Sequence, residues 1–506
     1  MTDHLPSQSI KVSLHPGITL VESGSEIALV SEYGRFPIAA TSPGIVDAFR
    51  ALVAGRSTET ELAGIVLESS GIAELTKFNF IFTQCILRCF VQYRIYVGDS
   101  PIATLALTVP HRRFLFPALD PAASYQVSRF AYCHREEEEM VAETPLFSAK
   151  LLLHDWRSSA LLSALSKRRT LAGLAAAMPF LSAEAIEGGV QLMTAARLIA
   201  PENNCDEAAS LPLQQWEFHD LLFHTRSRIG RHNHRIGATF RHLGKIAPLP
   251  LVEEQRVEEQ QHETFALPVP ASAGSGNAMT VFDAIEARRS IRQHGTQALT
   301  AEQLGEFLYR VARIRALWDF EVKGTDGALQ ETVQLSNRPY PAGGALYELE
   351  IYLTIDRCEG LEPGLYRYLP LTHKLMKVSV ANENTAALLR DACMASGITQ
   401  KPQMLISLAA RFQRMSWKYA SISYAATLKN VGVLYQTMYL VATGMGLAAC
   451  GLGSGNSDLF AEAAGTSYYA ETSVGEFMLG SLPESEELPP WMHDKNVRLN
   501  ESLPTL

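Results

Sequence analysis

Residues 249–279 divide this chain of 506 residues into two parts. The segment begins with clusters of glutamate and glutamine and continues, from Pro268 to Gly276, with proline, alanine, serine and glycine. Such a composition is typical of a connector rather than of a packed element. Because 506 residues are too many for one ordinary hydrophobic core, two or three domains are expected, and the connector predicts the main boundary between them.

Composition and charge exclude several classes of protein. A chain with 47% hydrophobic and 19% charged residues is typical of a soluble globular protein, and a net charge of −9 argues against a nucleic-acid binder, which must neutralise phosphates. The N-terminus lacks a secretory signal, and the most apolar window, residues 78–97, is interrupted by arginine and glutamine. Seven scattered cysteines favour reduced thiols, so we expect a cytoplasmic protein that contacts no membrane.

Residues 1–105 predict a winged-helix-like unit. Two short strand-like segments, joined by a Ser-Gly-Ser turn, precede a helix that begins near Pro43. Thr58 and Glu61 form a capping-box pattern at the start of the next helix. A third, apolar helix is predicted from about residue 72 to residue 94.

Residues 106–210 repeat this order of elements. Strand-like segments at 125–132 and 142–153 come first, and a helix over residues 182–199 closes the unit. Strands followed by three helices indicate a second winged-helix-like unit. Neither unit has a concentrated basic recognition helix, so a surface that binds a peptide strand by edge pairing and a purely structural platform both remain open.

Residues 211–278 are predicted to form a basic helix followed by the connector. The helical stretch, residues 214–245, is rich in arginine and histidine. His219 and His224 are five residues apart, whereas a helical zinc pair needs a spacing of four, so no metal site is predicted. A domain interface, a dimer contact and an acidic peptide remain candidate roles for this helix.

The C-terminal part, residues 279–506, begins with a cationic cluster. Four neighbouring side chains could hold a phosphate: Arg288, Arg289, Ser290 and Arg292. Guanidinium groups suit this task because they form paired, charge-assisted hydrogen bonds, although a solvated basic turn has the same composition. Thr300 and Gln303 then form a capping-box pattern that opens an amphipathic helix.

Two glycine-rich loops follow the cationic cluster. The first consists of Pro341, Ala342, Gly343 and Gly344, and the second of Gly451, Leu452, Gly453 and Ser454. Glycine lets a backbone approach a flat ring closely, although an ordinary tight turn uses the same residues. Between the loops, residues 420–443 predict a helix that is apolar all round, which should be buried in a dimer core.

Lys418 and Tyr419 precede this apolar helix and follow a strand that looks buried. Both groups titrate far above neutral pH when free, and burial or a cationic neighbour can bring either pKa closer to it. The two residues are therefore a candidate acid–base pair.

The C-terminal motifs resemble the nitroreductase flavoproteins and, more narrowly, the SagB-type azoline dehydrogenases. The resemblance rests on four segments: Arg-Pro-Tyr-Pro-Ala-Gly-Gly at 338–344, Gly-Leu-Glu-Pro-Gly-Leu-Tyr at 360–366, Trp-Lys-Tyr at 417–419, and residues 216–224. The size and the doubled winged-helix-like units look like those of cyanobactin oxidases. The resemblance is specific over residues 214–485 and architectural before them. Ala342 stands where the family often has serine, so a hydroxyl contact to the flavin is expected to be missing.

This resemblance implies an α+β fold whose nitroreductase-like domain, with a mixed or antiparallel sheet and helices, holds FMN in a homodimer. The implied reaction oxidises thiazoline or oxazoline rings of a ribosomally made precursor peptide to thiazoles or oxazoles. The cationic cluster would hold the FMN phosphate, and both glycine loops would line its ring. Our hypothesis makes Tyr419 the proton acceptor with Lys418 stabilising its phenolate, or the reverse. The front units would hold the peptide's leader, and a cyclodehydratase is a further candidate partner.

Two other functions remain open. A nitro- or quinone reductase fed by NADH or NADPH would keep the flavin and change the substrate. A winged-helix binding protein with a vestigial flavin domain would not be an enzyme at all.

Overall fold

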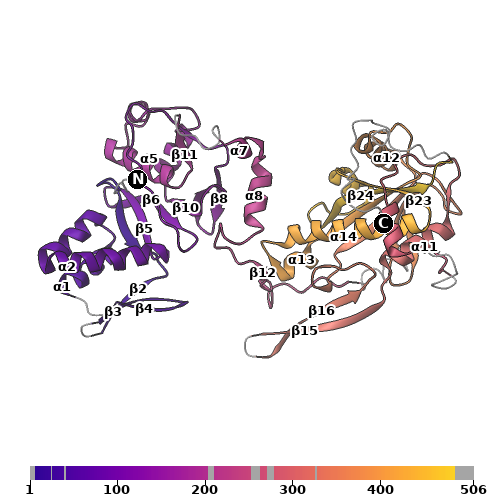
Figure 1. Cartoon of the computed structure of the whole chain (residues 1–506), viewed down its shortest axis with the longest axis horizontal. Coiled ribbons are helices and arrows are strands. Elements are labelled where there is room, and N and C mark those ends of the chain that lie inside the picture. Colours follow the sequence, from indigo (N-terminus) through magenta and orange to yellow (C-terminus); the bar gives the residue numbers. More distant parts are fainter. Residues whose placement is uncertain are drawn as a thin grey trace, which may run out of the picture. The chain divides into compact units, whose positions relative to one another are not determined.

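The chain folds into two compact units, residues 1–234 and residues 235–506, each with its own elements (Figure 1). In this computed structural model the described residues are 6–23, 26–38, 42–202, 210–251, 262–270, 279–324 and 327–484. Most of the predicted connector, residues 252–261 and 271–278, therefore lies outside the described residues.

The first unit opens with a small antiparallel sheet and two helices. The sheet contains β2 (Thr19–Ser23), β3 (Glu26–Ser31) and β4 (Gly34–Ile38), and the helices are α1 (Pro43–Ala54) and α2 (Glu59–Leu87). The predicted capping box is confirmed, because Thr58 accepts from the Glu61 amide while the Glu61 side chain accepts from the Thr58 amide. Gly71, with φ of 81°, interrupts α2 and separates the two helices that the sequence predicts there.

The predicted helix over residues 72–94 is wrong at its C-terminal end. The helix stops at Leu87, and residues 91–97 form β5 (Val91–Val97), which pairs with β6 (Ser100–Leu107). The segment Val-Gln-Tyr-Arg-Ile-Tyr-Val alternates and is rich in β-branched and aromatic residues, which is the signal of a strand. The apolar run before it concealed that change of period.

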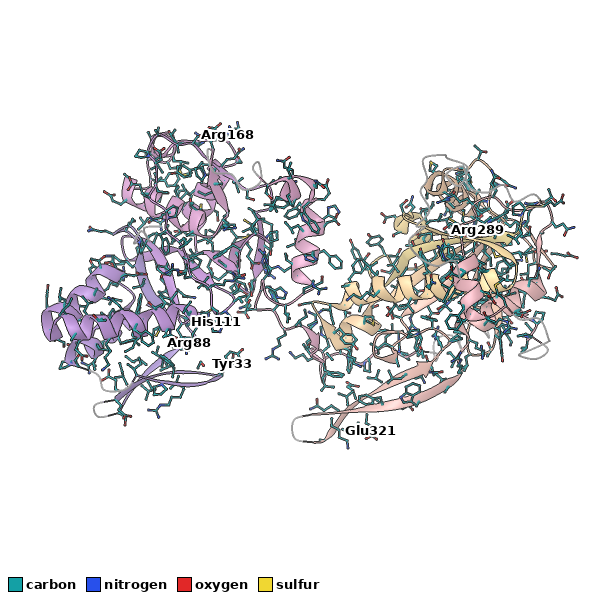
Figure 2. All side chains as sticks on the ribbon, viewed as in Figure 1. Tyr33, Arg88, His111, Arg168, Arg289 and Glu321 are labelled. Atoms are coloured by element: carbon teal, nitrogen blue, oxygen red, sulfur yellow. The ribbon has the colours of Figure 1, made fainter. Side chains whose placement is uncertain are left out.

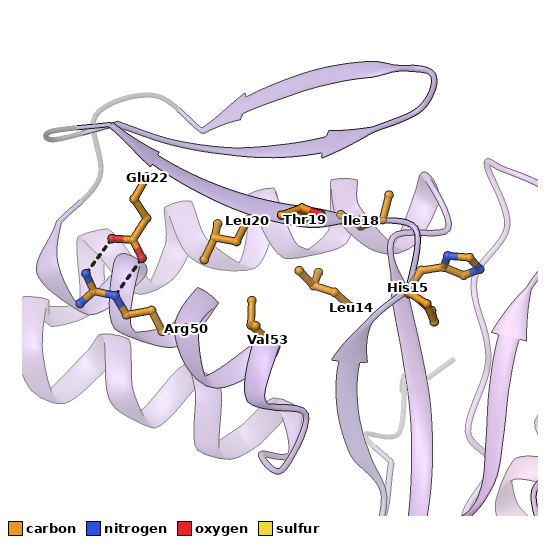
Figure 3. Close-up of a pocket in the computed structure, with 9 residues that line it drawn as sticks. Leu14, His15, Ile18, Thr19, Leu20, Glu22, Arg50 and Val53 are labelled. Carbon is orange, nitrogen blue, oxygen red and sulfur yellow. Dashed lines mark hydrogen bonds and ion pairs between the residues drawn. The ribbon is translucent and has the colours of Figure 1, made fainter.

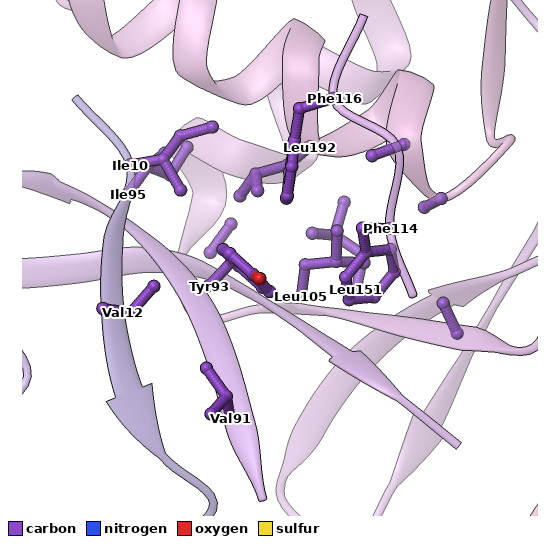
Figure 4. Close-up of a cluster of buried hydrophobic side chains, with 14 of the residues drawn as sticks. Ile10, Val12, Val91, Tyr93, Ile95, Leu105, Phe114, Phe116, Leu151 and Leu192 are labelled. Atoms are coloured by element: carbon purple, nitrogen blue, oxygen red, sulfur yellow. The ribbon is translucent and has the colours of Figure 1, made fainter. Parts of the chain in front are cut away.

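The largest sheet of the first unit is antiparallel and has the order β1-β5-β6-β10-β9-β8. The strands not yet introduced are β1 (Lys11–Leu14), β8 (Tyr132–Glu136), β9 (Glu139–Glu143) and β10 (Ala149–Leu153). Strands from residues 1–105 and 106–210 thus share a sheet, and one hydrophobic cluster includes Val12, Tyr93, Leu151 and Leu192 (Figure 4). The four-domain partition of the chain stays a prediction.

Helices and a two-stranded sheet complete the first unit. They are α3 (Trp156–Ala164), α4 (Leu171–Ala177), α5 (Ala183–Ala195), β7 (Tyr125–Val127), β11 (Ile199–Pro201), α7 (Leu211–Gln215) and α8 (Phe218–Arg226). The prediction of one helix over residues 214–245 is wrong, because helix ends at Arg226. Beyond it, Gly230, Gly237 and Gly244 all have positive φ, which an α-helix cannot contain.

The second unit is built on a seven-stranded antiparallel sheet of order β13-β20-β19-β17-β21-β24-β23. Its strands are β13 (Thr264–Ala266), β17 (Leu349–Ile355), β19 (Gly364–Leu369), β20 (Lys374–Val380), β21 (Met404–Arg411), β23 (Leu447–Leu452) and β24 (Glu471–Ser481). Two separate hydrophobic clusters cover the sheet. One contains side chains of α11 (Ala301–Ala312) and α14 (Ser423–Gly444), and the other contains those of α12 (Glu383–Ser396) and α15 (Ser457–Ala464).

This arrangement confirms a mixed α+β fold with an antiparallel sheet. The predicted capping box of α11 is also confirmed, and Leu304, Phe307 and Leu308 of that helix are fully buried. For α14 the outcome differs from the prediction of burial all round. Its Leu434 and Met438 are buried, whereas Tyr424 and Leu428 are exposed on the single chain.

A group of buried charges lies within the second unit's sheet. Glu350 on β17 is 1% exposed and forms ion pairs with Arg367 (3.5 Å) and Arg411 (3.7 Å). Burial works to raise the pKa of the Glu350 carboxyl, but the charges of Arg367 and Arg411, and then of Arg338 and Arg414, outweigh it and hold that pKa below its ordinary value. The ionised carboxylate therefore stabilises the fold at neutral pH, and this contribution is lost as the pH falls through its lowered pKa.

We predict that Glu350→Gln lowers the free energy of unfolding by about 3 kcal/mol, because it leaves two buried guanidinium groups without their counter-charge. Urea unfolding of the full chain, followed by circular dichroism at pH 7, measures the change. Glu321→Gln, at the exposed residue marked in Figure 2, is the matched control and should have little effect. Equal stability of the two variants would contradict the role assigned to Glu350.

No helix among the described residues is long and apolar enough to cross a membrane. Within the same residues, no group of three or more histidine, cysteine or acidic side chains is placed to hold a metal ion.

Candidate functional site

Lys418 and Tyr419 lie at the junction of α13 (Phe412–Lys418) and β22 (Tyr419–Ala420). The segment is held from several sides. Arg414 donates to the carbonyls of Leu346 (2.8 Å), Leu249 (2.6 Å) and Gln334 (2.8 Å), and the Trp417 indole donates to Ile246 O (2.6 Å). Both side chains are buried, so the backbone that carries Lys418 and Tyr419 has a defined position.

The structure brings this pair onto the first glycine loop. Gly344, in the short helix η2 (Gly343–Ala345), has φ of 64°, a conformation that favours glycine. A Cβ atom added at Gly344 would lie 2.5 Å from Tyr419 Oη and 2.7 Å from Lys418 Nζ. The two polar groups therefore converge over the α-carbon of Gly344, although their residues are more than seventy positions away in the chain.

Two buried polar residues that the sequence analysis missed support this loop. The Gly343 amide donates to Asn430 Oδ1 (3.1 Å), and Asn430 Nδ2 donates to both carboxylate oxygens of Glu348 (2.8 and 3.1 Å). An ionised carboxylate accepts hydrogen bonds and cannot donate them, so the Asn430 NH2 group must face Glu348. An asparagine within an otherwise apolar helix was the available signal.

Burial shifts the titration of the pair in opposite senses. Burial lowers the pKa of Lys418, because it disfavours the ammonium. Burial, and then the nearby Glu348 charge, raise the pKa of Tyr419. Burial also raises the pKa of Glu348 itself. The neutral forms of all three groups are thus favoured relative to the same groups in water.

A second cluster joins the cationic segment to the second glycine-rich segment, whose Gly451 and Leu452 lie in strand β23 rather than in the predicted loop. Ser290 follows α10 (Val281–Ala287), and its hydroxyl shares a 2.8 Å hydrogen bond with Tyr439 Oη, which in turn accepts from the Gly451 amide at 2.7 Å. The Arg288 guanidinium lies 5.3 Å from the centre of the Tyr439 ring. The Ile291 amide also donates to Ala449 O at 2.9 Å, so the cationic segment is attached to the β23 edge.

The other predicted residues have more varied positions. Arg292 and Pro341 are exposed, Arg289 and Ala342 are half-buried, and the Leu452 side chain packs into the sheet's hydrophobic cluster, which leaves only its backbone for a ligand. Gly453 has open space around its α-carbon, and Ser454 lines a hollow of about 700 Å³. A Cβ at Gly451 would come within 3.1 Å of the Tyr435 ring, so the backbone there is packed closely.

Both clusters contact the long helix α14. Asn430 holds the first loop and Tyr439 the second, and nine residues of helix correspond to a separation of about 13 Å along the axis. One end thus offers arginines and a serine hydroxyl, and the other offers a glycine backbone beside Lys418 and Tyr419. These donors fit an elongated ligand that carries an anionic group and a flat ring, as FMN does.

The first unit contains a separate groove. It has a volume of about 560 Å³ and lies between β2 and α1, where Leu20 and Val53 supply apolar walls and Glu22 pairs with Arg50 at 2.7 Å (Figure 3). Strand β2 is at the edge of its sheet, because β3 is its only partner among the described strands. An extended peptide could add to such an edge.

Comparison with protein families gives three matches in chain order. The ThcOx helix-turn-helix domain matches residues 7–116, the cyanobactin oxidase ThcOx family matches residues 125–233, and the nitroreductase family matches residues 285–481. The last match covers the cationic cluster, both glycine loops and the Lys418-Tyr419 pair.

Comparison with curated proteins gives two relatives whose names agree with these family matches. A Methanocaldococcus jannaschii protein named as a nitroreductase is 29% identical over 175 residues, which are 34% of this chain and 77% of that protein. The microcin B17-processing protein McbC of Escherichia coli is 34% identical over 117 residues, which are 22% of this chain and 42% of its own length.

Solved structures were also compared with the chain. A structure from Anabaena variabilis, described as a nitroreductase, aligns with 83% of this chain and 91% of its own at 15% identity and a TM-score of 0.35. A chain of the E. coli microcin synthetase McbBCD complex with truncated pro-MccB17 aligns with 52% of this chain and 91% of its own, at 21% identity and a TM-score of 0.32.

We predict that Gly344→Ala disables the site. The added methyl group would occupy the space of Tyr419 Oη and Lys418 Nζ and would strain the backbone, at a cost of about 1–2 kcal/mol. Activity should fall far more than stability, as measured by turnover and by the thermal unfolding midpoint. Gly64→Ala, in α2 where nothing lies within 4 Å, is the control: turnover should not change, and the midpoint should stay the same or rise slightly because alanine favours a helix. Normal turnover in Gly344→Ala would contradict the convergence on this residue.

Proposed function

We propose that this chain, which matches the nitroreductase family over residues 285–481 and ThcOx domains over residues 7–116 and 125–233, is an FMN-dependent azoline dehydrogenase. Its reaction would oxidise thiazoline or oxazoline rings of a ribosomally made peptide to thiazoles or oxazoles. The observation that carries the proposal is the convergence of Lys418 and Tyr419 over the Gly344 backbone. The name of the relative McbC, a microcin B17-processing protein, supports the proposal.

The reaction removes a proton and a hydride from adjacent ring carbons of the substrate. FMN, when bound, supplies the two-electron acceptor for this step. Four side chains would hold its phosphate, and backbone groups of both glycine loops would line its ring: Arg288, Arg289, Ser290, Arg292, then Pro341, Ala342, Gly343, Gly344, Gly451, Leu452, Gly453 and Ser454. The hydroxyl of Ser290 is already oriented by Tyr439, which places it beside the Gly451 amide.

The protein's own chemical task is to accept the proton from the ring carbon next to the imine and carbonyl groups. Of the two candidates, Lys418 is favoured as the immediate base, because burial lowers the pKa of its ammonium and so makes the free amine more available. Tyr419 is disfavoured in the same role, because burial and the Glu348 charge raise the pKa of its phenol. Neutral Tyr419 would instead donate a hydrogen bond and orient the substrate or Lys418.

The N-terminal unit and α14 each have a surface that a partner could cover. The groove between β2 and α1 is proposed to hold an extended segment of the precursor's leader against the β2 edge. Such docking raises the effective concentration of the ring-bearing core at the catalytic site. The exposed apolar side chains Tyr424 and Leu428 of α14 are proposed to be covered in a homodimer, and a cyclodehydratase that makes the azolines is the further partner.

The decisive experiment incubates the purified, flavin-loaded protein with an azoline-bearing peptide in air. A loss of two hydrogens per ring, measured by mass spectrometry, is the expected result. Rapid bleaching of the flavin by NADH or NADPH with turnover of a nitroaromatic, and no change in the peptide, would favour a reductase instead. Purified protein that lacks flavin absorbance and binds peptide tightly would favour a non-enzymatic binding protein.

We predict that Lys418→Ala and Tyr419→Phe both retain bound flavin and lose most of the azoline oxidation. A general base contributes about 10²–10⁴-fold to a rate, and the loss in Lys418→Ala should fall in this range. Flavin absorbance after gel filtration and single-turnover oxidation of the peptide are the two measurements. Lys401→Ala removes the same charge at an exposed lysine that pairs with Asp356 (3.4 Å) and serves as the control. Wild-type rates in both site variants would remove the proposed acid–base role.

We also predict the pH dependence of the reaction. If the free amine of Lys418 is the base, kcat/KM rises with pH and levels off at a pKa below that of an ordinary lysine. If the phenolate of Tyr419 is the base, the rise occurs above the ordinary tyrosine value, because its pKa is raised. Profiles of wild type and Tyr419→Phe distinguish the two, since only the first case leaves the rising limb in Tyr419→Phe.

A further inference from the structure

A second hollow of the first unit, separate from the groove at β2, has an unusual combination of walls. It has a volume of about 460 Å³ and lies where α8, the turn before it and the end of α5 meet. Leu213, Leu221 and Ile229 supply apolar surface, and Trp216 presents an indole that is 36% exposed. The described residues place this hollow wholly within the first compact unit.

The polar groups of the hollow are cationic. Arg197, Arg228 and Arg231 line it together with His224, and none of the described residues that line it is acidic. The carboxylate of Glu143 does not line the hollow and pairs with Arg226 at 2.6 Å. The hollow therefore has a positive potential over apolar walls, which suits an anionic ligand with apolar side chains.

Hydrogen bonds to backbone carbonyls hold one arginine of the hollow and the turn beside it. The Arg231 guanidinium donates to the carbonyls of Pro145 (3.1 Å) and Leu146 (2.9 Å), so its orientation is set before any ligand arrives. Arg129 donates to Trp216 O (3.0 Å), which steadies the turn that carries the indole. Such preorganisation reduces the entropy that a ligand must overcome on binding.

Arg197 occupies a backbone position where an arginine is unfavourable. It follows the end of α5 with φ of 57°, in the left-handed region, and the adjacent Leu198 amide donates back to Met193 O at 2.9 Å. Helices that end in this way usually have glycine there, because a side chain is strained in that conformation. The chain thus carries a guanidinium at the rim of the hollow at the expense of local backbone strain.

From these observations we propose that the hollow binds an acidic segment of the peptide substrate, with glutamate or aspartate carboxylates on the arginines and apolar side chains against Trp216 and Ile229. The proposal rests on the proposed function, which supplies a peptide as the substrate. It adds a second anchoring point, distinct from the groove between β2 and α1, that selects for carboxylates rather than for extended backbone.

A nucleic acid is a poorer fit for the same charges. The cationic groups are confined to one small hollow with apolar walls, whereas phosphate backbones require a continuous basic surface. A short acidic peptide places a few carboxylates at the hollow and leaves the rest of the surface uncontacted.

The test measures fluorescence anisotropy of two labelled synthetic peptides with the full-length, flavin-loaded protein. One peptide contains glutamates and leucines, and the other has glutamine in place of each glutamate. We expect the glutamate peptide to bind at least about tenfold more tightly, with a preference that shrinks at high salt because the contacts are ionic and exposed. Equal affinity for the two peptides overturns the proposal, as does displacement of the glutamate peptide by a single-stranded oligonucleotide at lower concentration than by unlabelled peptide.

Two variants and a control locate the binding. Arg228→Glu should weaken binding of the glutamate peptide at least about tenfold and leave that of the glutamine peptide unchanged. Arg197→Gly should weaken it likewise while the thermal unfolding midpoint stays the same or rises, because glycine relieves the left-handed backbone. Arg35→Ala, an exposed arginine on β4 outside the hollow, should bind as wild type does. Unchanged binding in both hollow variants overturns the assignment.

The outcome is separable from that of the proposed function. Oxidation of a short azoline substrate that lacks acidic residues reports on Lys418 and Tyr419 alone. If that substrate is oxidised and the glutamate peptide does not bind, only the acidic-peptide site fails. If the glutamate peptide binds at the arginines and no azoline is oxidised, the hollow is a peptide site and the proposed chemistry fails.

Discussion

The buried guanidinium of Arg414 joins the segments on which the candidate site depends. Its three donors reach carbonyls of Leu249, Gln334 and Leu346, which belong to three segments far apart in the chain. Burial, and then the nearby charges of Arg411 and Arg338, lower the pKa of Arg414 to about 9. The group is still charged at neutral pH, although its surroundings disfavour the charge. Three carbonyl acceptors are what makes such a burial tolerable.

The position of Arg414 explains why the glycine loop and the Lys418-Tyr419 pair meet. Arg414 is four residues before Lys418 on α13, and Leu346 is two residues after Gly344. A single side chain thus ties the helix that carries the pair to the loop that it faces. Glu348 and Asn430 tie the same loop to α14 from the other side. The loop is therefore determined by buried polar contacts rather than by its own sequence, whose glycines would otherwise permit many conformations.

Local signals in the sequence were enough for elements and caps, because these depend on neighbours in the chain. The capping boxes at Thr58 and Thr300 and the amphipathic face of α11 were predictable in this way. The second glycine loop was predicted only in part, because Gly451 and Leu452 belong to strand β23. The switch from helix to strand at residues 88–91 was not predictable, because a continuous apolar run is compatible with both the helical and the strand periodicity. The contacts of Glu348, Asn430 and Tyr439 were also out of reach, since each joins residues that only the tertiary fold brings together.

The electrostatics of the site argue for a division of labour between its two candidate bases. A Cβ atom added at Gly344 would lie almost equally close to Lys418 Nζ and Tyr419 Oη, so distance alone does not show which group is the base. Burial does separate them, because it penalises the charged form of each group: it favours the amine of lysine, which is basic, and the phenol of tyrosine, which is not. The Glu348 carboxylate strengthens the difference, since a negative charge opposes a phenolate. This difference is the reason that we propose Lys418 as the proton acceptor and Tyr419 as a hydrogen-bond donor.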